Sequence, residues 1–473
     1  MKQYPEHLFG TDGIRGTAND PTISPEVMIR VARLAGHLAG QRATKGKRQD
    51  ELHRVVIGKD TRLSGYMLEP ALTAGFVSVG MDVLLVGPIP TPGLAMLTQS
   101  MRAELGVMIS ASHNLYRDNG IKLFGSDGYK IPEAMEKEIE KLMNADLNPK
   151  AEAEQLGRAK RIDDAMGRYI EFVKNSFPKN YSLEGLKIVV DCAHGAAYKI
   201  APTVLSELGA DVIAIGVAPN GLNINLNSGS LHPAAIIDVV RKEKADVGIA
   251  LDGDADRLLL VDEQGEQLNG DKILAIIAHH WRQQGRLQGG VVGTVMSNLG
   301  LERFIQTLGV AFARVPVGDK NIIQKIRPAI NGQANNSQSE HYIIGAEPSG
   351  HVVMKNYGTT GDGLMAALQV LLAMRVGNQP LSHLRQLYQE TPEKTVNLKL
   401  KLGVDVNSLL TDHAVVPVLQ QMKQKVKNDG GLFLLRPSGT EKSILRLTVQ
   451  MQGASGIDGV IGAMTDSLKK FLL

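Results

Sequence analysis

The stretch Val55-Val-Ile-Gly-Lys-Asp60 decides the fold class, because a helical pattern follows it and then a second apolar run, Asp82-Val-Leu-Leu-Val-Gly87. An apolar run, a helix and another apolar run are the parts of a β-α-β unit. The same order returns at residues 188–216 and at residues 291–315. A unit repeated in this way indicates three related α/β domains, with mixed sheets that are covered by helices.

The C-terminal part of the chain follows a different pattern. Residues 396–402 alternate between apolar and polar side chains, and the apolar runs at 432–435 and 445–449 are bracketed by helical patterns. Alternation is typical of an antiparallel sheet with one solvated face, so we expect a fourth, α+β domain here. We therefore expect four domains around a central cleft, with bounds at residues 1–157, 158–257, 258–379 and 380–473.

Three aspartates stand at alternate positions in the run Asp252-Gly-Asp254-Ala-Asp256-Arg257, between apolar runs at 247–251 and 258–261. Alternate side chains of an extended segment point the same way, so three hard oxygen ligands would converge, which suits one Mg²⁺ ion. They would lie at the carboxyl end of a buried strand, where α/β sheets bind ligands. An EF-hand is rejected, because Arg257 takes the sixth position, which requires glycine. A solvated acidic turn is the weaker alternative, because two apolar runs flank the aspartates.

Ser112 directly follows another apolar run, 105–109, and has His113 and Asn114 beside it. Lys122 can return to the same place on the next expected strand. A Ser–His–Asp hydrolase is a fair alternative, but its Gly-x-Ser-x-Gly elbow is absent, since Ala111 and His113 flank the serine. A serine that accepts a phosphoryl group beside a metal needs no such elbow, because its chemistry is mostly positioning and charge neutralisation.

Two polar loops carry further candidates for binding. In Arg436-Pro-Ser438-Gly439-Thr440-Glu441 a guanidinium can grip phosphate with two hydrogen bonds, hydroxyls can donate, and glycine lets backbone N–H groups approach. This pattern predicts a phosphate-binding loop, and a hairpin turn is its simpler alternative. Glu347-Pro-Ser349-Gly350-His351 offers an acceptor and a hydroxyl that suit a sugar, with His351 as a proton carrier. Arg15 and the segment 58–62 supply further loop cations.

Composition excludes several classes of protein. The chain has 473 residues, a net charge of +3 and no clustered run of Lys and Arg, so we expect no nucleic acid partner. Neither a Walker A loop nor Gly-x-Gly-x-x-Gly is present, so ATP or NAD binding has no support. The start of the chain carries no apolar signal region and no long apolar stretch follows, so we expect a cytoplasmic protein without a membrane partner. Cys192, the only cysteine, rules out an internal disulfide.

These motifs, in this order, resemble the α-D-phosphohexomutases over nearly the full length of the chain. Within that family the resemblance is greatest to the bacterial members that act on glucosamine phosphates. The segments that carry the resemblance are residues 9–16, 58–65, 109–114, 118–122, 252–257, 347–351 and 436–441.

The resemblance implies a four-domain enzyme whose phosphoserine is Ser112. It implies that the phosphate on Ser112 holds Mg²⁺ together with Asp252, Asp254 and Asp256. The catalytic candidates beside Ser112 are His113, Lys122, Arg257, Arg15 and His351. Glu347 and Ser349 would grip the sugar, and a distal phosphate would be held by Arg436, Ser438, Gly439 and Thr440.

The reaction that this resemblance implies is the interconversion of glucosamine 6-phosphate and glucosamine 1-phosphate, for amino-sugar and cell-wall precursor synthesis. It passes through a 1,6-bisphosphate that turns over in the cleft, and a sugar 1,6-bisphosphate would also be the activator. The alternatives are a phosphoglucomutase or phosphomannomutase, and a non-catalytic protein that binds sugar phosphates. The chain departs from the family pattern at Leu115, Pro348, Pro437 and the polar segment 331–340. The oligomeric state is left open, with a homodimer among the states expected.

Overall fold

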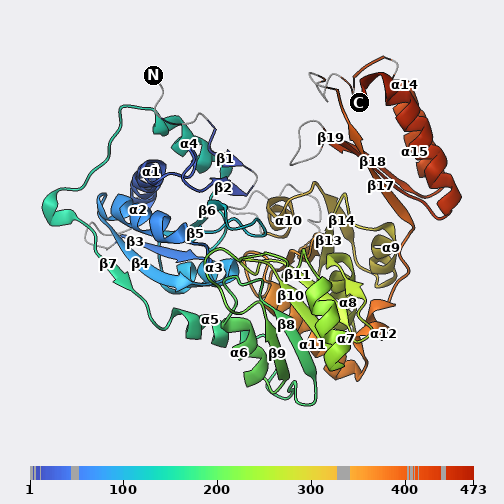
Figure 1. Cartoon of the computed structure of the whole chain (residues 1–473), viewed down its shortest axis with the longest axis horizontal. Coiled ribbons are helices and arrows are strands. Elements are labelled where there is room, and N and C mark those ends of the chain that lie inside the picture. The colour runs from blue at the N-terminus through green and yellow to red at the C-terminus, as the bar shows by residue number, and fades with distance from the viewer. Residues whose placement is uncertain are drawn as a thin grey trace. The chain divides into compact units, whose positions relative to one another are not determined.

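The computed structural model describes residues 4, 7–10, 12–43, 53–327, 341–401, 404, 409, 411–413, 415–437 and 444–473 (Figure 1). The chain divides into two compact units. One consists of Met1–Thr294 with Ala313–Gln386, and the other of Val295–Phe312 with Leu387–Leu473. No helix among the described residues is both long enough and apolar enough to cross a membrane.

The first unit begins with a mixed sheet of seven strands in the order β1-β2-β6-β5-β3-β4-β7. Its centre is parallel, because β3 pairs in parallel with both β4 and β5, whereas β6 pairs antiparallel with β5 and β2. The predicted strand, helix and strand at residues 55–87 are confirmed as β3, α2 and β4. The strands are β1 (Phe9–Gly10), β2 (Gly13–Thr17), β3 (His53–Lys59), β4 (Met81–Pro88), β5 (Leu105–Ile109), β6 (Asp118–Gly125) and β7 (Ala159–Arg161).

Helices cover both faces of this sheet. On one face α1 (Pro25–Ala43), α2 (Gly65–Val77) and α4 (Glu133–Met143) share a single apolar core with the strands. The helix α3 (Thr91–Ser100) packs against β3 and β5. Parallel strands buried in this way are apolar throughout, and every residue of β5 is buried.

The second sheet has five strands in the order β12-β11-β10-β8-β9. The strand β8 pairs in parallel with β9 and β10, and β11 returns antiparallel to β10. The prediction at residues 188–216 is confirmed as β8, α6 and β9. The elements are β8 (Lys187–Asp191), β9 (Asp211–Ile215), β10 (Val247–Leu251), β11 (Leu258–Asp262), β12 (Gln267–Leu268), α5 (Ala165–Lys174), α6 (Ile200–Glu207) and α7 (Ala234–Glu243), preceded by the short helix η1 (Ala153–Gln155).

The third sheet has four strands in the order β14-β13-β15-β16. The predicted order at residues 291–315 is present as β13, α9 and β14, but α9 groups with the second compact unit and not with this sheet. The elements are β13 (Gly290–Thr294), β14 (Phe312–Val315), β15 (Tyr342–Ala346), β16 (Val352–Met354), α8 (Gly270–Gln283), α10 (Asp319–Ile326), α11 (Gly363–Gly377) and α12 (Leu381–Arg385).

The second compact unit contains an antiparallel sheet of three strands in the order β17-β19-β18 (the red ribbon in Figure 1). Its strands and the helices α14 and α15 bury a separate apolar core, so the predicted α+β domain is confirmed. The elements are α9 (Leu299–Thr307), β17 (Glu393–Lys399), α14 (Val415–Asn428), β18 (Leu432–Pro437), β19 (Ile444–Gln450), α15 (Ala454–Leu468) and η2 (Lys469–Phe471).

Candidate active site

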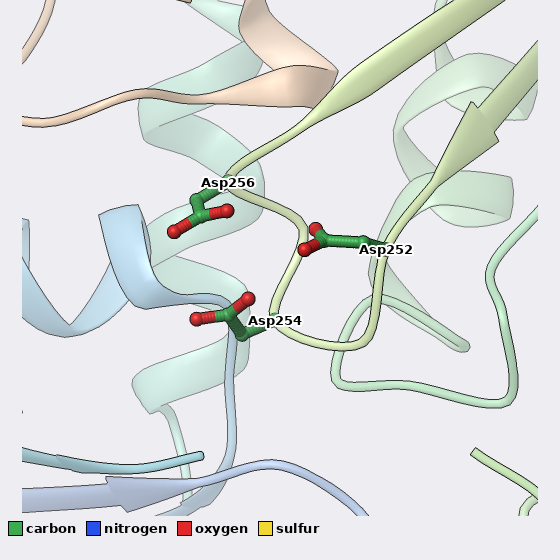
Figure 2. Close-up of side chains that lie close together, drawn as sticks. All are labelled: Asp252, Asp254 and Asp256. Carbon is green, nitrogen blue, oxygen red and sulfur yellow. The ribbon is translucent and has the colours of Figure 1, made fainter. Parts of the chain in front are cut away.

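The three aspartates of the predicted metal site lie in the loop between β10 and β11, and their carboxylates converge (Figure 2). All three are buried, and one oxygen from each lies within 4.8 Å of the others. The reason that we expected for this convergence is wrong, because the segment is a turn and not an extended strand. The backbone N–H of Ala255 donates to the carbonyl oxygen of Asp252 over 3.1 Å, and Ala255 has a left-handed φ of 56°.

Repulsion among these carboxylates makes the loop a natural cation site. Burial, followed by the charges of Asp256 and Asp254, raises the pKa of Asp252 to about 8. Buried Oδ1 atoms of Asp254 and Asp256 have no hydrogen-bond partner in the described part of the chain. Buried polar atoms of this kind normally have a partner, and carboxylate oxygens are the ligands that Mg²⁺ prefers. The residues therefore fit a divalent cation.

Lys122 supplies a positive charge to the same loop. It lies on β6, and its buried ammonium group donates to Oδ2 of Asp254 over 2.9 Å and to Oδ2 of Asp256 over 3.0 Å. Burial opposes its charged form, but the carboxylates of Asp12, Asp254 and Asp256 raise the pKa of Lys122 well above its usual value. The lysine therefore remains a cation beside the aspartates.

Ser112 lies just beyond the end of β5, and its hydroxyl points at the loop between β10 and β11, residues 252–257, which we call the metal loop. Its Oγ donates to Oδ2 of Asp252 over 2.6 Å, and the residue is only 1% exposed. Its φ of 48° is left-handed, a conformation that few residues other than glycine adopt without support from their surroundings. The structure therefore brings together the predicted nucleophile and the predicted metal ligands, in a conformation that neighbouring groups must stabilise.

Arg62 provides much of that support, although we expected it only as a loop cation. Its guanidinium is fully buried, and its Nε donates to Asp60 over 2.8 Å. The other four N–H groups donate to backbone carbonyl oxygens of the loop between β5 and β6 (residues 110–117, the serine loop) and of the first residue of β6, so all five donors of the group are used. These oxygens belong to Ser112, Asn114, Leu115 and Asp118.

Two loop residues, Asn225 between β9 and α7 and Gly253 between β10 and β11, complete the support of the serine loop. The amide of Asn225 donates to the carbonyl oxygens of Ser112 and Asn114 over 2.8 and 2.9 Å. Gly253 packs so closely that an added Cβ would lie 2.6 Å from the carbonyl oxygen of Ser112. A side chain does not fit at this position without displacing its neighbours, so glycine allows the metal loop to lie directly against the serine loop.

The other predicted catalytic residues, Arg257, His113 and Arg15, lie in or near these two loops. Arg257 donates its backbone N–H to Oδ1 of Asp252 over 3.2 Å, and its Nε has no partner among the described residues. Burial lowers the pKa of Arg257, but Asp256 and Asp252 outweigh that effect and raise it. Burial, Arg257 and Arg15 lower the pKa of His113 to about 4, so this imidazole is neutral at neutral pH. The side chain of Arg15 donates to Asp12.

The predicted sugar loop is joined to the metal loop through the backbone. Leu258 donates its N–H to the carbonyl oxygen of Gly350 over 3.0 Å, and Arg257 pairs with His351 in an isolated antiparallel bridge. Gly350 has a φ of 91°, and a Cβ there would lie 2.0 Å from the carbonyl oxygen of Leu258, so only glycine fits. Glu347 is buried and accepts the N–H of Gly318 over 2.8 Å, whereas Ser349 is exposed.

A closed ring of alternating basic and acidic side chains connects His351 to Lys122. His351 lies 3.8 Å from Asp256 and 3.6 Å from Asp319. Lys130 then bridges Asp319 at 2.6 Å and Asp12 at 2.5 Å, and Asp12 lies 3.4 Å from Lys122. Burial opposes the charged form of His351, but Asp256 and Asp319 raise its pKa. The sequence did not identify Asp12, Lys130 or Asp319 as site residues. Of the three, only Asp12 lies in a segment that carries the family resemblance, residues 9–16.

The expected phosphate-binding loop is described only in part. Arg436 stands opposite Arg446 in the pairing of β18 with β19, and burial followed by the charge of Arg446 lowers the pKa of Arg436. The rest of the predicted loop, Ser438, Gly439 and Thr440, lies outside the described residues, as does the segment 331–340. Two of the residues that depart from the family pattern take part in hydrogen bonds through their backbone. The carbonyl oxygen of Leu115 accepts a hydrogen bond from Arg62, and that of Pro348 accepts one from the N–H of Gly270.

The chain is similar to known proteins over nearly its whole length. Three family models match, all described as phosphoglucomutase/phosphomannomutase: α/β/α domain I at residues 6–150, domain II at 167–265 and domain III at 269–391. A phosphoglucosamine mutase of Rhodospirillum rubrum is 50% identical over 457 residues, covering 96% of each chain. One of Rhodopseudomonas palustris is 50% identical over 462 residues, covering 97% of each chain.

A solved structure shares the fold at much lower identity. It is a phosphoglucomutase/phosphomannomutase family protein from Burkholderia thailandensis, which aligns with a TM-score of 0.78 and 22% identity. The alignment covers 99% of this chain and 98% of the other.

Proposed function

We propose that this chain, which belongs to the phosphoglucomutase/phosphomannomutase family, is a phosphoglucosamine mutase that interconverts glucosamine 6-phosphate and glucosamine 1-phosphate. One observation supports this chemistry above all: the Ser112 hydroxyl donates a hydrogen bond to Asp252, one of the three buried aspartates. Relatives of about 50% identity over nearly the whole chain support the choice of amino sugar.

Ser112 is the phosphoryl carrier in this proposal. Phosphorylated Ser112 transfers its phosphoryl group to the free hydroxyl of glucosamine 6-phosphate. The bond from phosphorus to the serine oxygen breaks as the bond from phosphorus to the sugar oxygen forms. The product is a 1,6-bisphosphate, which turns over and returns its other phosphoryl group to Ser112. The buried left-handed backbone at Ser112, held by Arg62 and Asn225, supports this role because phosphoryl transfer depends mainly on positioning.

The polar and charged side chains around Ser112 have separate roles in the transfer. Lys122 and Arg257 neutralise negative charge on the moving phosphoryl group, with Arg15 nearby and neutral His113 as a hydrogen-bonding group. We assign His351, buried beside Asp256, to the transfer of the proton that the sugar hydroxyl releases.

One Mg²⁺ ion per chain is the cofactor that we propose. Asp252, Asp254 and Asp256 would hold it together with the phosphate on Ser112, and when bound it would supply charge neutralisation at the phosphoryl group. Burial and the neighbouring carboxylates, which raise the pKa of Asp252, support this choice, as does Oδ1 of Asp254, which is buried without a hydrogen-bond partner among the described residues. A sugar 1,6-bisphosphate would load Ser112 and so act as the activator.

Two loops would hold the rest of the substrate. Glu347 and Ser349 would bind sugar hydroxyls, since Glu347 is fixed by the N–H of Gly318 and Ser349 remains exposed. Arg436, Ser438, Gly439 and Thr440 would bind the distal phosphate. The domain bounds given above, a cytoplasmic location, a homodimer and a role in cell-wall precursor synthesis are further parts of the proposal.

A phosphorus NMR assay tests this function. The protein is supplied with Mg²⁺ and a trace of glucosamine 1,6-bisphosphate, and glucosamine, glucose and mannose 6-phosphates are compared at equal concentrations. We expect the 1-phosphate of glucosamine to form fastest. Faster conversion of glucose or mannose 6-phosphate would mean that the enzyme prefers a hexose. Pro348, in the predicted sugar loop, would then be the first residue to test as the cause. No conversion of any sugar by folded, phosphorylated protein would contradict a catalytic function.

A further inference from the structure

Thr91 makes two hydrogen bonds to Asp254, although it lies 163 positions earlier in the chain. Its hydroxyl donates to Oδ2 of Asp254 over 2.5 Å, and its backbone N–H donates to the carbonyl oxygen of the same residue over 3.0 Å. Thr91 is the first residue of α3 and is completely buried. A residue of the first domain therefore fixes both the backbone and the carboxylate of an aspartate in the metal loop.

The two oxygens of the Asp254 carboxylate differ in their surroundings. Oδ2 accepts hydrogen bonds from both Thr91 and Lys122, over 2.5 and 2.9 Å. Oδ1 is buried and has no partner among the described residues. With two donors fixed on Oδ2, the carboxylate cannot rotate freely, and Oδ1 is the oxygen left available to a cation.

We propose that Thr91 is a positioning residue of the metal site, whose hydroxyl orients the Asp254 carboxylate so that Oδ1 faces the ion. This inference rests on the metal site of the proposed function but not on the sugar that the enzyme converts. Groups that orient a ligand in this way typically change metal affinity about 10- to 100-fold when they are removed. Thr91 touches neither the ion nor the sugar in this account.

Direct binding of Mn²⁺ tests the proposal without any assay of catalysis. Free Mn²⁺ is measured by electron paramagnetic resonance during titration of the full-length protein. Thr91→Val removes the hydroxyl at nearly constant shape, and we expect its Kd for Mn²⁺ to rise about tenfold or more. Thr91→Ser keeps the hydroxyl and should bind as the unmodified protein does.

Thr98 offers a matched control on the same helix. It is equally buried, and among the described residues its hydroxyl donates only to the carbonyl oxygen of Leu94, within the helix α3. Thr98→Val therefore removes a buried hydroxyl from the same helix without touching Asp254, and its affinity for Mn²⁺ should be unchanged. If Thr91→Val shows no cooperative thermal transition, Thr91→Cys takes its place and is compared with Thr91→Ser, because a thiol is a weak donor.

The possible outcomes distinguish the role of Thr91 from the metal site on which that role rests. Unchanged Mn²⁺ affinity in folded Thr91→Val, beside normal binding by the unmodified protein, would overturn the role of Thr91 and leave the proposed function intact. An equal loss of affinity in Thr98→Val would also overturn it, because the effect would then be a general one on the helix. Failure of the unmodified protein to bind Mn²⁺ would overturn both this role and the metal site on which it rests.

Discussion

The Ser112 hydroxyl lies 2.6 Å from Oδ2 of Asp252, although 140 positions separate the two residues in the chain. Each stands at the carboxyl end of a fully buried strand, β5 for the serine and β10 for the aspartate. The two strands belong to different sheets. The geometry of the site therefore depends on the residues that hold the serine loop and the metal loop, such as Arg62 and Gly253.

Replacing Arg62 by lysine should damage both stability and catalysis. Lysine cannot reproduce the planar group that serves Asp60 and four carbonyl oxygens, so several buried acceptors would lose their partner. We expect a loss of about 2–5 kcal/mol in the free energy of unfolding, measured with urea, and a marked fall in kcat. Arg168→Lys, at an exposed pair with Asp164, is the control and should change little. Equal stability of the two variants would contradict the role given to Arg62.

Adding a methyl group at Gly253 should separate the two loops. A Cβ there would lie 2.6 Å from the carbonyl oxygen of Ser112 and 2.9 Å from the amide nitrogen of Asn225. We expect Gly253→Ala to lower kcat by about tenfold or more, because small displacements of reacting groups are costly. Gly167→Ala meets no atom within 4 Å and should keep full activity. Activity of Gly253→Ala equal to that of the control would mean that loop contact is unimportant.

Asp362 should make the protein less stable as the pH rises from about 4 to about 6. Burial raises the pKa of this carboxyl from 3.8 to about 6, although it accepts hydrogen bonds from Met365 and Tyr169. The folded state therefore keeps a proton that the unfolded state has already lost in this range, and stability falls by roughly 2–3 kcal/mol with rising pH.

Asp362→Asn provides the comparison for this pH dependence. The amide does not titrate, and its oxygen can still accept the N–H of Met365 at the start of α11. Urea unfolding at several pH values should therefore show a smaller decrease in the variant between pH 4 and 6. An identical pH dependence in both proteins would exclude Asp362 as its source.

Mg²⁺ should stabilise the folded protein through the aspartate triad. A ligand that binds only the folded state adds about 2.7 kcal/mol at a concentration 100 times its Kd, so Tm should rise by several degrees. Asp254→Asn should abolish most of this rise, whereas Asp238→Asn, exposed on α7, should retain it. Differential scanning calorimetry with and without Mg²⁺ measures both. A full rise in Asp254→Asn would place the ion elsewhere.

Much of the fold could be predicted because its signals are local. Short apolar runs with helical patterns between them identified the β-α-β units, and alternation at residues 396–402 identified the antiparallel domain. The grouping of α9 with the second unit could not be predicted, because it depends on contacts such as Asn298 with Thr391, 93 positions apart. Nothing in the local pattern of 299–308 distinguishes that helix from those that cover their own sheet.

The candidate site, like the fold, could be predicted only in part. Ser112 and the three aspartates could be found because each motif is continuous in the sequence, even though a turn and not a strand brings the aspartates together. Thr91, Lys130 and Asp319 could not be found, since their partners lie far away; Lys130 and Asp319 are 189 positions apart. Arg62 was visible as a cation, but only the packed structure shows that it is buried against backbone carbonyl oxygens.

The most direct test of the central claim follows the phosphoryl group on Ser112. Protein phosphorylated with a bisphosphate whose phosphoryl groups carry a heavy oxygen isotope is freed of excess reagent, mixed with one equivalent of unlabelled glucosamine 6-phosphate and Mg²⁺, and measured by intact mass and by peptide mass spectrometry. We predict one isotopically heavy phosphoryl group on Ser112 at the start. Within a single turnover that group should appear on the glucosamine 1-phosphate product, while Ser112 carries the unlabelled phosphoryl group that came from glucosamine 6-phosphate, and Ser112→Ala should not be phosphorylated. Labelling of Ser112→Ala at another residue, or a phosphoryl group on Ser112 that the sugar never removes, would contradict the account.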